Sequence, residues 1–219
     1  MKIHPIVLFA LLIAALSGPV LPSMIQAQSM APSEDSPSIA GTVTSAQADG
    51  TYTRPTEAIL LHNYRFDAFG PYPIAASALT AGANQFSNEP PEWKQGVDGY
   101  FKRFGSDFGI VAVGTTTRYA LAEAFKVDTM YYRCECRGVF PRVEHAAIST
   151  LTGRRGNDGH RVFSFPSLVA PYAGTMTAVY GWYPNRFGAK DAFRMGNYTL
   201  LGYAAGNVVL EFFYSGPHS

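Results

Sequence analysis

The chain has 219 residues with 17 basic and 16 acidic side chains, so its formal charge is nearly balanced. That balance does not indicate a nucleic-acid-binding protein, which needs a clustered excess of Lys and Arg to neutralise phosphates. Hydrophobic residues make up 47% of the sequence and charged residues 15%, which indicates an extensive core, contact with a membrane, or both.

Residues 1–27 are predicted to be a signal peptide. Lys2 lies before an apolar run over residues 5–16, and a Gly-Pro pair and a further Pro interrupt the chain before the small residue Ala27. The run is too short and too interrupted to be a good membrane span, although an uncleaved anchor is an alternative. We therefore expect an exported protein that resides in the periplasm or is associated with the outer membrane.

Residues 28–58 are predicted to be a flexible linker. The segment is rich in Ser, Pro, Ala and Thr and has no apolar period, so it cannot bury enough surface to offset the entropy of ordering. Residues 59–215 are predicted to form a single helical domain, which is long enough to enclose a core.

The pattern past the linker favours an all-α fold, a compact bundle of about five to six helices. Prolines at first-turn positions, helix-stopping glycines and apolar residues at helical spacing recur along it. They predict helices over 72–86, 91–104, 106–125, 140–153, 165–184 and 190–215, with a polar Gly-rich turn over 154–163.

Two alternatives to this fold class are open. Residues 173–184 and 207–214 are rich in β-branched and aromatic side chains, which would suit an α+β fold. Residues 167–183 and 198–214 are apolar and just short of a membrane span, which would suit a membrane-embedded helical bundle.

Five short blocks occur in a characteristic order: GYFKRFGSDFG (99–109), YYR (131–133), RVEHA (142–146), GWYPNR (181–186) and GNVVLEF (206–212). In order and spacing the chain resembles a group of exported proteins common in soil bacteria of the Acidobacteria type, for which no activity is established. The resemblance covers about residues 70–214. It implies export and a compact helical domain behind a linker, and it gives no information about an activity.

Cys134 and Cys136 stand one residue apart between two arginines. Export places both thiols in an oxidising compartment, so we expect them to pair in a disulfide or to be inert. Flanking positive charge would lower the thiol pKa, which leaves a redox role as an alternative. A zinc site with His145 and His160 is a further alternative, although an isolated C-x-C lacks the spacing of known zinc modules.

His145, Arg142 and Glu144 form the candidate catalytic cluster. An arginine can hold a phosphate while a histidine transfers protons or attacks, so this combination suits hydrolysis of a phosphate ester. The interpretation that we favour is that His145 caps or packs within a short helix, with Arg142 and Glu144 on its solvent-facing side. Glu211 lies in an apolar stretch and must be paired, protonated or solvent-facing, and Arg118 or Arg186 is its expected ion-pair partner.

The sequence favours an exported cell-envelope protein with a non-catalytic structural or interaction role, in contact with the membrane surface or with an envelope protein. Neither a cofactor, a metal nor a nucleic-acid partner is expected. The first alternative is an envelope hydrolase that acts on a phosphate-bearing or lipid substrate through His145 and Arg142. The second is redox or metal handling through Cys134 and Cys136.

Overall fold

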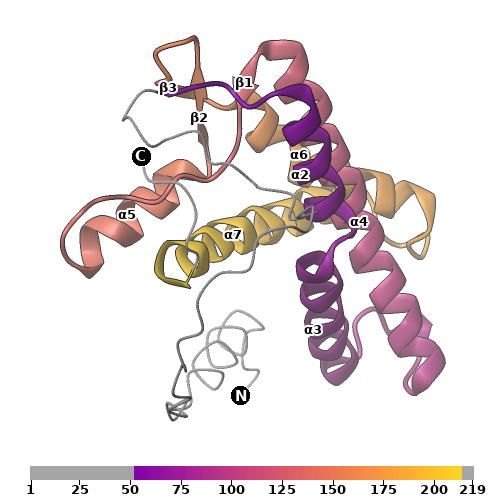
Figure 1. Ribbon diagram of the computed structural model, residues 1–219. Helices are drawn as coiled ribbons and strands as arrows, with labels where there is room; N and C mark the ends of the chain where they lie inside the picture. The colour runs from indigo at the N-terminus through magenta and orange to yellow at the C-terminus, as the bar shows by residue number, and fades with distance from the viewer. Residues whose placement is uncertain (1–51, 214–219) are drawn as a thin grey trace, which may run out of the picture. The chain divides into compact units, whose positions relative to one another are not determined.

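The computed structural model describes residues 52–213, so the predicted signal peptide and most of the predicted linker lie outside the described residues. The predicted all-α class is confirmed, with a small antiparallel sheet in addition (Figure 1). The helices are α2 (Glu57–Phe69), α3 (Pro71–Ser87), α4 (Val97–Phe125), α5 (Val139–Ser149), α6 (Phe165–Gly181) and α7 (Ala189–Phe213), with a 3-10 turn η1 (Pro91–Trp93). The strands are β1 (Val127–Asp128), β2 (Thr152–Arg155) and β3 (His160–Phe163).

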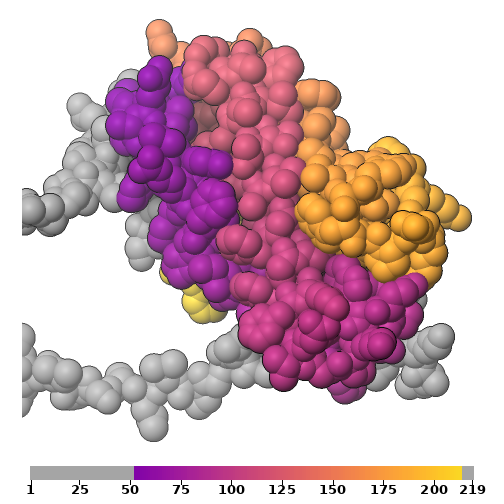
Figure 2. All heavy atoms as spheres, turned by 90° about the vertical axis from the view of Figure 1, so that its right-hand side faces the viewer, coloured from indigo at the N-terminus to yellow at the C-terminus, as the bar shows by residue number. Residues whose placement is uncertain are grey.

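Helix α4 is the longest element, and most of the other helices are arranged around it. It packs against α6, α3 and α2, while α7 packs between α6 and α5. Figure 2 shows α4 (pink) between earlier parts of the chain (indigo to purple) and the end of α6 with the loop that follows it (orange).

Small residues let α4 and α6 approach closely. A Cβ at Gly174 would lie 2.4 Å from the carbonyl oxygen of Ile110, and a Cβ at Gly114 would lie 3.0 Å from the carbonyl oxygen of Ala170. Backbones at this separation leave no room for large side chains, so the contact depends on dispersion between closely packed main chains.

Helix α4 corrects one prediction. The sequence pattern indicated separate helices over 91–104 and 106–125, whereas residues 97–125 form one continuous helix and only Pro91–Trp93 form a separate 3-10 turn. Gly105 does not end the helix. A glycine inside a helix costs only about 1 kcal/mol relative to Ala, and the packing of α4 against α3 and α6 offsets this cost.

Arg103 fixes the connection between α3 and α4. Its side chain is fully buried and donates hydrogen bonds to the backbone carbonyls of Glu89 (2.7 Å), Lys94 (2.8 Å) and Pro90 (2.8 Å). A further bond reaches the side-chain oxygen of Gln85 (2.5 Å). The guanidinium thus satisfies carbonyl groups of a loop in which η1 is the one regular element.

The predicted polar turn over 154–163 is instead part of a β-hairpin. β2 pairs antiparallel with both β1 and β3, in the order β1-β2-β3. Gly156 and Gly159 have φ values of +75° and +62°, a conformation that residues with a Cβ seldom adopt. These two glycines therefore make the turn between β2 and β3.

The folded part begins earlier than the predicted boundary at residue 59. Tyr52 is buried, its hydroxyl donates to Oδ2 of Asp128 at 3.1 Å, and its ring leaves no space for a Cβ at Gly159. Thr56 then caps α2 by accepting a hydrogen bond from the backbone N–H of Ile59. The last residues assigned to the linker thus belong to the fold.

The two segments with a competing strand prediction are helical. Residues 173–181 lie in α6 and residues 207–213 lie in α7. Within the described residues, no helix combines the length and the apolar character needed to cross a membrane.

Candidate functional site

Segments that are distant in the sequence meet around the carboxylate of Glu211. Glu211 lies near the end of α7, and its side chain is 0% exposed. Helix α5 packs against α7 and contributes Arg142 and His145. The segment 129–138, which joins β1 to α5, supplies further hydrogen-bond donors.

Both carboxylate oxygens of Glu211 accept hydrogen bonds. Oε2 accepts from the hydroxyl of Tyr131 at 2.5 Å and from the backbone N–H of Cys134 at 3.1 Å. Oε1 accepts from Nε of Arg142 at 2.9 Å, and Nη2 of Arg142 donates to the Glu211 carbonyl. Burial raises the pKa of Glu211, but these hydrogen bonds outweigh it and hold the pKa below its usual range. Glu211 is therefore an ionised carboxylate that joins α7, α5 and the segment before α5.

His145 lies between Glu211 and Arg161. Its side chain is 8% exposed, and Nη2 of Arg161 donates to its Nε2. Since Nε2 accepts a hydrogen bond, the neutral ring carries its proton on Nδ1. This Nδ1 atom lies 3.8 Å from Oε2 of Glu211 and has no hydrogen-bond partner among the described residues. Burial and the positive charge of Arg161 lower the pKa of His145, so the neutral form is favoured.

This geometry limits the chemistry of the cluster. Arg142 and Glu211 neutralise each other, and the Nε2 lone pair of His145 already accepts from a guanidinium. A general base needs a free lone pair within reach of a substrate proton. In this arrangement the cluster holds three segments together, and it offers a substrate neither a free base nor a free carboxylate.

The structure brings together only some of the residues that the sequence singled out. His145 and Arg142 lie in the cluster, whereas Glu144 is exposed on another face of α5. The predicted Arg118–Glu211 pair is wrong. Nη2 of Arg118 donates to Asp67 at 3.0 Å, because α4 presents Arg118 to α2 while α5 presents its own arginine to Glu211.

The sulfur atoms of Cys134 and Cys136 lie within bonding distance of each other. The backbone N–H of Cys136 also points at the Cys134 sulfur, while the backbone N–H of Cys134 donates to Glu211. His160, the other residue of the zinc alternative, is exposed and contacts Asp158 at 2.8 Å. Across residues 52–213, no group of three or more His, Cys, Asp or Glu side chains is placed to hold a metal ion.

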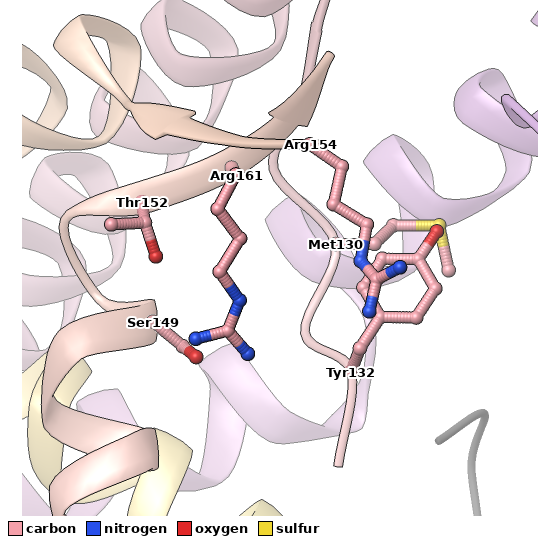
Figure 3. A pocket seen from close by; sticks show the side chains of 7 residues that line it. Met130, Tyr132, Ser149, Thr152, Arg154 and Arg161 are labelled. Carbon is pink, nitrogen blue, oxygen red and sulfur yellow. The ribbon is translucent and has the colours of Figure 1, made fainter. Parts of the chain in front are cut away.

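A second polar cluster lies at the sheet and was not singled out in the sequence. Oδ2 of Asp128 accepts from the hydroxyls of Tyr52 (3.1 Å) and Tyr132 (2.6 Å), and Oδ1 accepts from the Met130 N–H. The guanidinium of Arg154 lies over the Tyr132 ring, 4.3 Å from its centroid (Figure 3). The arginines of the hairpin sequence could have indicated this cluster. The strands are too short, however, for the sequence to show which arginines lie on the same face.

The outer face of α3 is another feature that was not singled out in the sequence. Pro73, Ser77 and Ala81 are the buried positions of this helix. Tyr72 (66% exposed), Leu79 (46%) and Phe86 (82%) lie seven residues apart, at intervals that keep them on one side. None of the 17 residues of α3 is charged, and that absence was visible in the sequence.

Comparison with known proteins gives no relative. No family model matches the chain, and neither a curated protein nor a solved structure matches it. The resemblance to exported proteins of soil bacteria stays a prediction.

Proposed function

We propose that this chain is an exported, non-catalytic interaction domain of the cell envelope, and that the outer face of α3 binds an apolar helix of an envelope protein. The observation that carries the proposal is the uncharged, exposed stripe of Tyr72, Leu79 and Phe86. A helix that faces water normally carries charged residues on that side, so exposed apolar side chains without them favour an interaction site.

The spacing of the stripe favours a helix as its partner. Apolar residues every seven positions form the seam along which two helices pack. Ala75, Ala76 and Gly82 are exposed between the large side chains, and the space beside Gly82 is open, so a second backbone could approach closely. A helix that lies on a membrane surface carries Lys or Arg on its polar face, and α3 has neither.

The hydrogen bonding of Glu211 supports a non-catalytic role. Arg142 and Glu211 are committed to each other, and His145 accepts from Arg161. The hydrolase alternative would need these groups free to contact a substrate.

The test is a binding comparison with envelope vesicles in buffer and after an alkaline carbonate wash. The double variant Leu79→Ser, Phe86→Ser changes two exposed side chains of α3. The matched control, Phe140→Ser with Leu201→Ser, changes exposed side chains on α5 and α7. We expect carbonate to release the wild type, the α3 variant to bind at least about tenfold more weakly, and the control to bind as the wild type does.

Two further measurements separate this proposal from its alternatives. Protease treatment of the vesicles should abolish binding; binding to protein-free liposomes of the same lipids would instead identify the membrane as the partner. His145→Ala should leave any turnover of p-nitrophenyl phosphate unchanged. A loss of turnover at unaltered thermal stability would contradict a non-catalytic role.

A further inference from the structure

Two arginines lie directly opposite each other in the β-hairpin. Arg154 on β2 is the register partner of Arg161 on β3, so both side chains belong to the same face of the sheet. Like charges at directly opposed positions of antiparallel strands destabilise the pair. Among the described residues, neither arginine forms an ion pair with a carboxylate: Arg161 contacts His145, and Arg154 lies over the Tyr132 ring.

The neighbouring groups offset the charge only in part. Asp128 is the register partner of Arg154 on the other side, but its carboxylate accepts from two tyrosines and a backbone N–H. Arg154 rests on the ring of Tyr132, and Arg161 donates to His145, whose neutral form is favoured. The row Asp128–Arg154–Arg161 therefore retains an excess positive charge.

The surrounding sequence has the same imbalance. Residues 126–163 contain seven basic and four acidic side chains, whereas the rest of the described chain contains nine of each. The excess positive charge of residues 52–213 is thus concentrated in the segment that includes the sheet, and an anion approaching the protein is attracted there.

A small cavity lies between the two arginines. Its volume is about 20 Å³, and its walls include Tyr132, Ser149 and Thr152 besides Arg154 and Arg161. Figure 3 shows Arg161 extending toward Ser149, with Arg154 across the cavity. A cavity of roughly 10–15 Å³ holds one water molecule, so this one admits an oxygen atom or two of a ligand and no carbon skeleton.

We propose that this cavity binds the oxygen atoms of a phosphate group. Free N–H groups of Arg154 and Arg161 and the hydroxyl of Ser149 would donate to it, whereas the hydroxyl of Thr152 already donates to the Ile148 carbonyl and only forms the wall. A tetrahedral dianion can accept from three separate directions and neutralises two guanidinium groups, which a planar monoanionic carboxylate cannot do. This site is independent of the α3 face.

The test is titration with inorganic phosphate, followed by calorimetry and by the melting temperature. The full chain is kept in a phosphate-free buffer, and sodium chloride holds the ionic strength constant. Arg154→Gln should weaken phosphate binding at least about tenfold. Arg155→Gln removes the same charge from the next position of the strand, whose side chain points to the opposite face, and should stay within about twofold of the wild type.

Ser149→Ala keeps the proposal testable if the arginine variant is unstable. It removes one hydroxyl, and we expect it to weaken binding by a few-fold at an unchanged melting temperature in the absence of phosphate. Glycerol phosphate that binds more tightly than inorganic phosphate would indicate a ligand that carries the group, and equal affinities would indicate free phosphate. No saturable phosphate binding, tighter binding of acetate, or equal weakening by Arg155→Gln would overturn the proposal.

Discussion

Asp107 on α4 provides the sharpest test of the electrostatics of this fold. Burial raises the pKa of its carboxyl group to about 7, although a hydrogen bond from Asn84 and the charge of Arg103 act in the opposite direction. The Asn84 amide lies 3.4 Å from Oδ2 of Asp107. The folded protein therefore keeps this proton at pH values where the unfolded chain has released it.

The direction in which the free energy of unfolding changes with pH follows from the number of protons bound in the folded and unfolded states. Between pH 4 and 7 the unfolded state binds fewer protons at this position than the folded state, so the free energy of unfolding falls as the pH rises. Each pH unit is worth about 1.4 kcal/mol, which gives about 4 kcal/mol over the full range. Because Asp107 keeps partial contact with solvent, we expect about half of this, near 2 kcal/mol.

Asp107→Asn replaces the carboxyl group by a neutral side chain of the same shape. The free energy of unfolding of the variant should not show this decrease with pH. Its stability relative to the wild type should therefore improve by about 2 kcal/mol between pH 4 and pH 7. Urea denaturation at a series of pH values measures the difference. Trp182 is a suitable fluorescence reporter, because its indole N–H donates to Ser106, the neighbour of Asp107, at 2.9 Å.

The matched control is Asp98→Asn, which removes an exposed carboxylate from the same helix. Its profile should keep the wild-type slope between pH 4 and 7. Parallel profiles for Asp107→Asn and the wild type would refute the reasoning, since they would mean that Asp107 exchanges its proton equally in the folded and unfolded states.

Three further substitutions test the packing and the buried polar groups by urea denaturation. Gly174→Ala should cost about 2–3 kcal/mol, because the added methyl group meets the α4 backbone, whereas Gly202→Ala, with open space around it, should be neutral or stabilise by up to about 1 kcal/mol. Arg103→Gln should cost about 3 kcal/mol and increase proteolysis of the α3–α4 loop, because several carbonyls lose a charged donor. Glu211→Gln should cost about 3–5 kcal/mol, while Glu144→Gln on the surface should change stability by less than about 0.5 kcal/mol. Equal effects within either matched pair would contradict the assigned roles.

Local signals located the last two helices. Ser164 caps α6 and Pro166 occupies its first turn, which are contacts between near neighbours in the chain. The predicted ranges 165–184 and 190–215 accordingly agree closely with α6 and α7. The hairpin was missed because strands of four residues are too short for an alternating pattern to be distinguished from a polar turn.

The candidate cluster could be predicted only in part. Arg142 and His145 are near neighbours on α5, so their proximity was visible in the sequence. Glu211 was recognised as a carboxylate that needs a partner, and Arg118 or Arg186 was expected to supply it. That Arg142 is the partner depends on which helix packs against the end of α7. Sequence separation gives no information on that choice.

The sequence by itself determined the helical class and most helix positions, because propensity, capping and proline act over a few residues. The sequence also shows that residues 71–87 carry no charged side chain and that residues 126–163 contain an excess of arginine. Only the tertiary structure decided that Arg142 pairs with Glu211 and that Arg154 faces Arg161. Such pairings depend on how distant elements pack and on strand register, which local preferences do not specify.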